Sequence, residues 1–316
     1  MIPALIIAHA NYEAVKKRLT ELRSFEIHEI FIYVDGYNDD GNIQRLHQRT
    51  QLIEMLEKEL SLSKLSRVHF CETNTGVGIA VPSAVDWFFQ NVDCGLILED
   101  DCSLQPYAEV FLSQCKQFIT TNPNSIVCLS NPNLSMSRFL HASEMTLIPS
   151  NFFSSWGWVC HRETWERVSI RKIELLEVLS AVRRSNDISR LDQFWLTLSW
   201  MDIWSTLRAN QFRLCAFRFT ILLITSGVQI YYPSIKLVQH SPNEGSTNVF
   251  IQPIWDEGQN LECVPRVSSQ NYTVFDRNLL DQYIARNVQG AEFLGLLVRL
   301  THRLVKKMKP NNRRSY

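Results

Sequence analysis

The chain has 316 residues, 45% of them apolar, with 11 Gly, 11 Pro and 8 Cys, which suits one large or two modest globular domains and excludes a disordered, collagenous or small disulfide-stapled protein. Its 32 Lys and Arg balance 32 Asp and Glu, and a net charge of zero argues against a protein that wraps nucleic acid with its whole surface. Residues 299–316 hold seven basic side chains and no acidic one, so residues 1–298 have 25 basic against 32 acidic side chains.

The first residues predict a strand. Residues 1–9 have no basic n-region, and their apolar run is too short for a signal peptide. The longest uncharged apolar stretch, Phe219–Tyr232, is shorter than the roughly 20 residues that span a bilayer. The eight cysteines form no CxxC pair, which is typical of reduced core thiols. We therefore expect a cytoplasmic protein without a transmembrane helix.

Strand and helix patterns alternate about every 30 residues through the first 130 residues. The predicted strands are Ala4–Ala8, Ile30–Val34, Val68–Cys71, Leu96–Leu98 and Ile126–Leu129. The predicted helices between them are Tyr12–Leu22, Ile43–Leu60, Pro82–Phe89 and Tyr107–Ile119. This alternation predicts an α/β fold with a mostly parallel, Rossmann-type sheet flanked by helices.

Ligands of such sheets bind at the carboxyl ends of the strands, so the residues after each strand are the candidates for a site. These residues are His9–Asn11, Asp35–Gly36, Glu72–Gly78, Glu99–Asp101 and Ser130–Asn131.

Three carboxylates follow the fourth strand in Gly95-Leu96-Ile97-Leu98-Glu99-Asp100-Asp101. Adjacent like charges repel, and a divalent cation would neutralise them. In extended backbone Glu99 and Asp101 point to one side and Asp100 to the other, so one side can face a metal and the other a ribose hydroxyl. A cation there could bridge the two phosphates of a nucleotide-sugar. A solvated acidic turn is the alternative.

Two further polar segments follow strands. Asp35 ends the second strand, where a carboxylate can accept from a base or a ribose hydroxyl, or can simply belong to a turn. In Asn74-Thr75-Gly76-Val77-Gly78 the glycines let the backbone approach a ligand. The third glycine of a dinucleotide fingerprint is missing, so an NAD-dependent oxidoreductase is a weaker hypothesis.

The alternation lapses after Pro132, where tryptophan becomes frequent. Residues 241–270 are rich in Pro, Gly, Asn and Ser and predict a long loop, and a helical tail is expected from about Arg277.

The chain resembles bacterial GT-A-type glycosyltransferases of the nucleotide-diphospho-sugar transferase superfamily, often labelled haemolytic-protein-like and distantly similar to the Golgi N-acetylglucosaminyltransferase of N-glycan branching. The resemblance covers roughly residues 3–250. Its landmarks, in order, are Asp35-Gly36; Asn74, Gly76, Ala80, Ala84, Trp87, Phe88 and Phe89; Leu98 to Cys102; Trp156-Gly157-Trp158 with Trp165 beyond; and Pro233, Leu237 and Val238 before Thr247 and Asn248.

The resemblance implies a GT-A fold with a nucleotide-sugar-binding half (1–132), an acceptor-side half of the same domain (133–250), and a loop with a basic C-terminal helix (251–316). It implies that Asp101, with Glu99, holds Mn²⁺ or Mg²⁺ on the diphosphate of a UDP- or GDP-sugar. Donor-binding residues would be Asp35, Asn74, Gly76, Glu99, Asp100 and Trp156. Trp156-Gly157-Trp158 would line the sugar and acceptor pocket, since flat rings suit the apolar face of a pyranose, although Trp158 and Trp165 also fit an ordinary core.

The sequence departs from this family at two donor-side positions. Where many relatives have Asn-Arg-Pro after the first strand, this chain has His9-Ala10-Asn11, so a cation that could touch the nucleotide is missing. Gly78-Ile79 replaces the basic pair of the Asn-x-Gly segment.

The catalytic base is also open. The family's catalytic Asp aligns with Ala216, and the same register places Arg218 two residues on, where it could brace a phosphate or pair with a buried acid. Asp192 or Asp202 could lie near the acceptor, but each is on a predicted helix. Glu244 and His240 could close over the donor or add a metal ligand. We take Asp192, Arg218 and Glu244 as catalytic candidates.

The tail predicts a basic amphipathic helix. Its apolar residues are Phe293, Leu297, Leu300, Leu304 and Met308, with Arg299, Arg303, Lys306 and Lys307 between them. Residues 293–314 could bind an anionic membrane at the inner face of the cytoplasmic membrane, or pack on the domain. The sequence thus predicts a metal-dependent glycosyltransferase acting on a saccharide or lipid-linked saccharide in cell-surface polysaccharide synthesis, and no nucleic-acid partner. A catalytically silent relative that binds nucleotide-sugar or glycan is the alternative.

Overall fold

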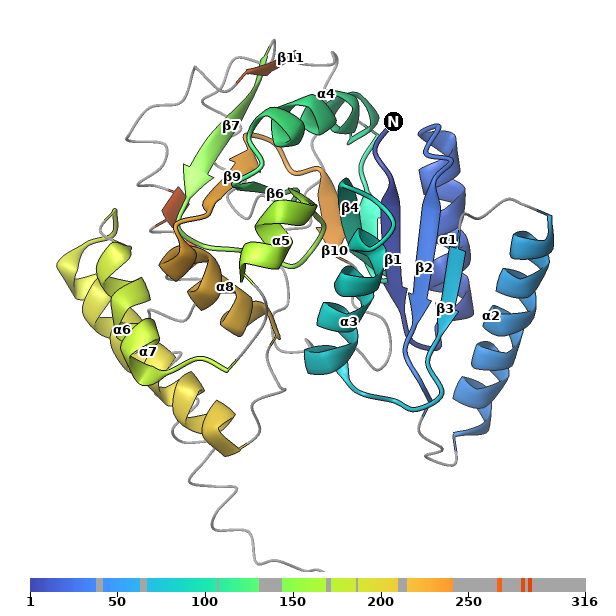
Figure 1. Cartoon of the computed structure of the whole chain (residues 1–316), viewed down its shortest axis with the longest axis horizontal. Coiled ribbons are helices and arrows are strands. Elements are labelled where there is room, and N and C mark those ends of the chain that lie inside the picture. Colours follow the sequence, from blue (N-terminus) through green and yellow to red (C-terminus); the bar gives the residue numbers. More distant parts are fainter. Residues whose placement is uncertain are drawn as a thin grey trace, which may run out of the picture.

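The computed structural model describes residues 1–37, 42–62, 67–106, 108–130, 144–168, 172–185, 187–209, 215–240, 266–268, 280–281 and 284–285. In this part of the chain a central sheet lies between two layers of helices (Figure 1). The predicted α/β class is confirmed.

The described residues form a nine-stranded sheet in the order β11-β7-β9-β6-β8-β4-β1-β2-β3. Its strands are β1 (Ala4–Ala8), β2 (Ile30–Val34), β3 (Arg67–Phe70), β4 (Cys94–Glu99), β6 (Ser125–Cys128), β7 (Glu144–Ser150), β8 (Trp158–His161), β9 (Gln229–Pro233) and β11 (Arg266–Ser268). β1 to β4 are parallel, in the order 3-2-1-4 of a doubly wound sheet. β8 lies between β4 and β6 and is antiparallel to both. β6 is parallel to β9. A separate ribbon pairs β5 (Cys102–Leu104) with β10 (Val238–His240).

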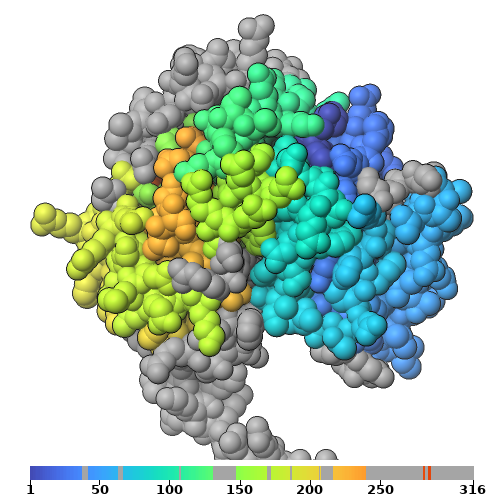
Figure 2. Space-filling view, in the orientation of Figure 1, coloured from blue at the N-terminus to red at the C-terminus, as the bar shows by residue number. Residues whose placement is uncertain are grey.

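Alternate side chains of the sheet pack on different helices, because successive residues of a strand point to opposite faces. Leu5, Ile7 and Ile97 pack with α3 (Val77–Phe89), α5 (Arg162–Val168), α6 (Leu175–Arg184), α7 (Arg190–Ala209) and α8 (Cys215–Ser226). Ala4, Ile6 and Leu96 pack with α1 (Tyr12–Ser24), α2 (Ile43–Ser61) and α4 (Ala108–Thr121). Figure 2 shows α3 and α5 covering the first of these faces.

The five predicted strands all exist, and the bounds of β1 and β2 match the prediction. Helix α3 begins at Val77 rather than at Pro82, so this proline lies inside the helix. Proline has no backbone N–H, so the carbonyl of Gly78, four residues earlier, receives no bond from within the helix.

In the described second half of the chain, β7, β8, β9 and β11 join the same sheet, and β10 pairs with β5 in the separate ribbon. β11 lies inside the predicted loop 241–270, so the prediction of a continuous loop is wrong at residues 266–268, which pair with β7. Leu280, Ile284 and Ala285 are buried in the same apolar cluster as Leu5, Ile7 and Ile97. The predicted amphipathic helix 293–308 lies outside the described residues.

Candidate functional site

Polar side chains gather at the carboxyl ends of β1, β2 and β4, as the parallel order requires. Asp35, directly after β2, is buried, and its Oδ1 accepts from the Gly36 amide at 2.8 Å and from the amide and hydroxyl of Thr75 at 3.1 Å each. Its Oδ2 accepts from the Gly76 amide at 3.2 Å. Asp35 therefore fixes the turn that begins α3, and its contact with a nucleotide stays a prediction.

The turn before α3 closes tightly on the end of β2. A Cβ at Gly36 would lie 1.9 Å from the carbonyl carbon of Thr73, so only glycine fits there. Gly76, at the N-cap of α3, has a φ of 76°, which favours glycine. The side-chain Nδ2 of Asn74 donates to the Gly36 carbonyl at 3.0 Å and also lies 2.9 Å from His9 Nε2. Asn74 thus joins the ends of β1 and β2.

Two rings and a cation complete this cluster. The rings of His9 and Tyr37 are stacked, with centroids 6.4 Å apart and an interplanar angle of 26°. Arg49 of α2 donates from one guanidinium nitrogen to the carbonyls of His9 at 2.9 Å and Asp35 at 2.7 Å, and its guanidinium carbon lies 5.9 Å from the Tyr37 ring centroid. The sequence indicates only that the basic residue of the family after the first strand is missing at His9-Ala10-Asn11. Arg49 was missed because it lies on a helix far from the strand ends in sequence.

The carboxylate turn lies beside this cluster. Glu99, the last residue of β4, is in register with Ile7, and the Asp100 amide donates to the Ile7 carbonyl at 3.1 Å. Glu99 hydrogen-bonds Ser155, whereas Asp100 accepts from the backbone of His9, so the two carboxyls have different partners. Asp100 and Asp101 lie in a turn, not in the extended backbone on which the prediction of opposite sides depended. Burial and the neighbouring carboxylates, Asp101 above all, raise the pKa of Glu99 to about 8 and that of Asp100 to about 7.

These carboxyls fit a divalent cation, which would offset the repulsion that raises their pKa values. In the part of the chain that the structure describes, no three His, Cys, Asp or Glu side chains enclose a metal position by themselves. A cation at this turn would therefore complete its shell with phosphate oxygens or water, as Mg²⁺ commonly does.

The tryptophans of Trp156-Gly157-Trp158 have different environments. Trp156 is half-buried, but Trp158 and Trp165 are buried, and both pack on Phe219 with centroids 5.4 and 5.3 Å away. Trp158 therefore belongs to the core, and its predicted place in the sugar pocket is wrong. Gly157 has a φ of 73°, which turns the chain between the two rings.

Asp192 has a structural role at the start of α7. Its backbone amide donates to Ser189 Oγ at 3.1 Å, and that hydroxyl donates to Asp192 Oδ2 at 2.7 Å. This arrangement caps the helix. The side chain is buried, so the structure gives no support to its predicted role as catalytic base.

Arg218 on α8 is buried and donates to the carbonyl of Gly78 at 2.8 Å. Gly78 is four residues before Pro82, so the guanidinium takes the place of the helical hydrogen bond that this proline cannot make. Arg218 thus joins α8 to α3, a role other than the phosphate contact that the sequence suggested.

The other acceptor-side candidates are placed in part. Asp202 is half-buried on α7, and Ala216 lies in the first turn of α8. His240 is the last residue of β10, not part of a loop, and its backbone is opposite Cys102, next to the carboxylate turn. Glu244 lies outside the described residues.

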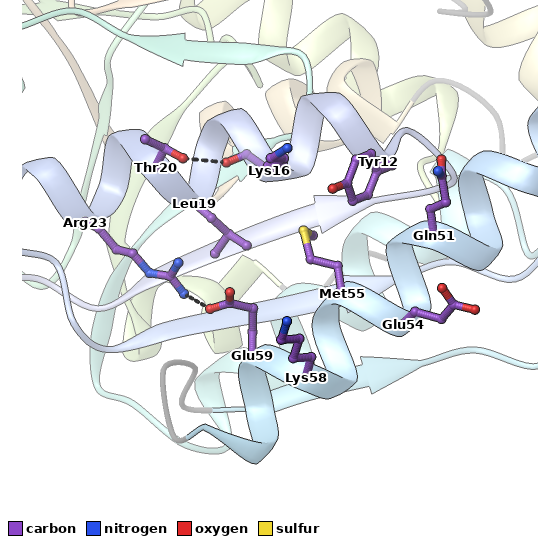
Figure 3. Close-up of a pocket in the computed structure, with 10 residues that line it drawn as sticks. All are labelled: Tyr12, Lys16, Leu19, Thr20, Arg23, Gln51, Glu54, Met55, Lys58 and Glu59. Atoms are coloured by element: carbon purple, nitrogen blue, oxygen red, sulfur yellow. Dashed lines mark hydrogen bonds and ion pairs between the residues drawn. The ribbon is translucent and has the colours of Figure 1, made fainter.

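A groove of about 520 Å³ runs between α1 and α2 on the outer helical layer (Figure 3). Tyr12 and Gln51 lie at one end of it, and an Arg23–Glu59 ion pair of 2.6 Å lies at the other. None of the predicted site residues lines this groove. Among the described helices, none has the length and apolar character needed to cross a membrane.

No family model matches the sequence, and no curated protein is significantly similar to it. Solved structures that share part of the fold include a cytidylyltransferase from Leptospira borgpetersenii serovar Hardjo-bovis, with 13% identity, 54% of this chain, 65% of that chain and a TM-score of 0.31. S. aureus TarS 1-349 is 14% identical in sequence, and the alignment covers 70% of this chain and 69% of that chain with a TM-score of 0.35. An apo-UDP-glucose pyrophosphorylase is 10% identical in sequence, and the alignment covers 55% of this chain and 82% of that chain with a TM-score of 0.31. This chain thus spans less than two thirds of the cytidylyltransferase, and similarity this low does not identify a reaction.

Proposed function

We propose that the chain is a metal-dependent glycosyltransferase that moves a hexosyl or N-acetylhexosaminyl group from a UDP- or GDP-sugar to a saccharide. The main support is the turn Glu99-Asp100-Asp101 at the carboxyl end of β4, which meets the polar cluster at the ends of β1 and β2 through the Asp100 amide and the Ile7 carbonyl. Carboxylates with raised pKa values beside a preformed polar cluster are typical of a binding site for a charged ligand.

Asp101 and Glu99 would hold Mn²⁺ or Mg²⁺, and the ion would take up negative charge on the leaving diphosphate. The chain's own residues would orient the rest of the donor. The stacked rings of His9 and Tyr37 would provide a flat surface for the base, with Asn74 beside them. At the N-terminus of α3 the Gly76 amide already donates to Asp35, so the phosphates would be favoured only by the amides of the first turn that follow Gly76.

The acceptor would lie on the side of Ser155, to which Glu99 is hydrogen-bonded. Half-buried Trp156 would pack on the apolar face of the sugar. Glu244 stays the remaining candidate for the base. Residues 293–314 would hold the enzyme at the anionic inner face of the cytoplasmic membrane, which would suit a lipid-linked saccharide.

The test is the variant Asp101→Asn, which removes one negative charge at the proposed metal. Mn²⁺ with UDP or GDP should raise the melting temperature of the wild type, and the variant should lose this shift and at least ~100-fold in donor turnover. The matched control is Asp93→Asn, an exposed residue directly before β4 that pairs with Arg162, and it should behave as the wild type. No shift with any nucleoside diphosphate, or an equal shift in the variant, would contradict the proposal.

A catalytically silent binding module is the second candidate. The structural roles of Asp192 and Arg218 favour this second function. Of the three predicted catalytic residues, these two then have no part in the reaction, and only Glu244 is left. Mn²⁺-dependent binding with neither transfer nor donor hydrolysis would support this second function. Turnover that Asp101→Asn abolishes would exclude it.

A further inference from the structure

Helix α1 carries an ion pair on its buried side. Arg18 is only 3% exposed and lies in the same apolar stripe as Val15, Leu19 and Leu22, and it bonds to Glu21 one turn later. Burying two charges costs free energy, and apolar replacements of such pairs are often neutral or stabilising. The Nε of Arg18 is buried and makes no hydrogen bond to any described residue. Stability alone therefore does not explain why these charges are here.

The pair holds both ends of the short strand β5. Arg18 donates to the Cys102 carbonyl at 2.7 Å, and Glu21 accepts from the Leu104 amide at 3.3 Å. Cys102 and Leu104 are alternate residues of one strand, so their backbone groups point to the same edge. On the other edge β5 pairs with β10, and the amide of Gln105 donates to the Leu237 carbonyl at 2.9 Å. The ion pair thus binds the edge of β5 that no described strand covers.

β5 begins directly after Asp101, so its position sets where the carboxylate turn ends. The other end of the turn is held by the bond from the Asp100 amide to the Ile7 carbonyl. We propose that Arg18, together with Glu21, is a positioning residue that holds the Asp101 carboxylate in place for the cation of the donor diphosphate. This inference rests on the proposed function, and it adds α1 to the groups that build the site.

The experiment replaces the pair by apolar residues of similar length, Arg18→Met with Glu21→Leu, so that no charge is left buried alone. The affinity for Mn²⁺ in the presence of UDP, or of GDP where UDP does not bind, is measured by calorimetry, and the melting temperature is measured beside it. We expect the affinity to fall at least tenfold while the melting temperature stays within a few degrees. The matched control removes the other ion pair of α1, Arg23→Met with Glu59→Leu, at the end of the groove in Figure 3, and should leave the affinity unchanged.

A conservative variant keeps the test open if the double variant fails to fold. In Arg18→Lys an ammonium group replaces the planar guanidinium. It can still donate to the Cys102 carbonyl or to Glu21, but it bonds both together less well than arginine does. We expect a loss of affinity of about threefold to fivefold at an unchanged melting temperature, smaller than in the double variant. Wild-type affinity in both variants would overturn the positioning role while leaving the proposed function intact. A wild type that binds neither nucleotide with Mn²⁺ would overturn both.

Discussion

The strand ends of the first half and the helices of the second half use their polar side chains differently. At the ends of β1, β2 and β4, Asp35, Asp100 and Asn74 are positioned by backbone groups of neighbouring strands and turns. On α7 and α8, Asp192 and Arg218 instead bond within the helical layer, one to a helix cap and one to a helix carbonyl. The charged side chains of α7 and α8 therefore serve packing and capping, whereas the polar residues after the parallel strands meet at one end of the sheet.

The largest expected change in the free energy of unfolding comes from Asp281, in the C-terminal segment of the second half. Asp281 is fully buried, and its carboxylate accepts from Ser150 Oγ at 2.6 Å, from the Asn151 amide at 3.1 Å and from Asn151 Nδ2 at 2.7 Å. Asp281→Ala should lower the free energy of unfolding by about 3 kcal/mol, because it takes this acceptor from the buried Ser150 hydroxyl and from two partly buried donors of Asn151. Denaturant unfolding measures this change.

Asp281→Asn is the matched control, since its amide oxygen still accepts one of these bonds, and it should lose about half as much. A loss below ~1 kcal/mol in Asp281→Ala would mean that this segment does not stabilise the domain.

Arg218 tests whether the helical side uses its charges for packing. Arg218→Met should lower the free energy of unfolding by about 2–3 kcal/mol, because the Gly78 carbonyl loses its donor. In a Pro82→Ala background the helix can make its own bond to Gly78, so the same substitution should cost about 1 kcal/mol less. The double-mutant cycle measures this coupling by denaturant unfolding. Additive effects would show that Arg218 does not substitute for the bond that Pro82 lacks.

The fold of the first half could be predicted because its strands are continuous buried runs between amphipathic helices. β1 and β2 match their predicted bounds for this reason. The strands β7, β8 and β9 could not be predicted, since each joins the sheet through pairing with residues distant in sequence. The start of α3 was missed because proline usually marks the beginning of a helix, and the compensating Arg218 lies 136 positions further along the chain.

The candidate site could be predicted at the strand ends but not where helices supply it. Asp35 and Glu99–Asp101 were found from their positions after strands. Arg18 had a signal that was not used, a charged residue within the apolar stripe of α1. For Arg49 the sequence offered no comparable signal, because nothing in the residue spacing of α2 shows that this side chain reaches the ends of β1 and β2.

Substitution of Asp192 should change the free energy of unfolding least, and it tests most directly whether the helices of the second half use their charges for structure rather than for catalysis. Asp192→Ala removes the bond from the Ser189 hydroxyl to the carboxylate, so it should lower the free energy of unfolding by about 1 kcal/mol and leave transfer within about twofold of the wild type. Ser189→Ala removes this bond and also the bond from the Asp192 backbone amide, so it should cost more, and the double variant should be no less stable than Ser189→Ala. Denaturant unfolding with a transfer assay measures both quantities. A loss of transfer of ~100-fold in Asp192→Ala, with transfer unaffected in Ser189→Ala, would instead make this carboxylate the catalytic base, because Ser189→Ala disrupts the cap more and would lower transfer as well if the cap were the cause.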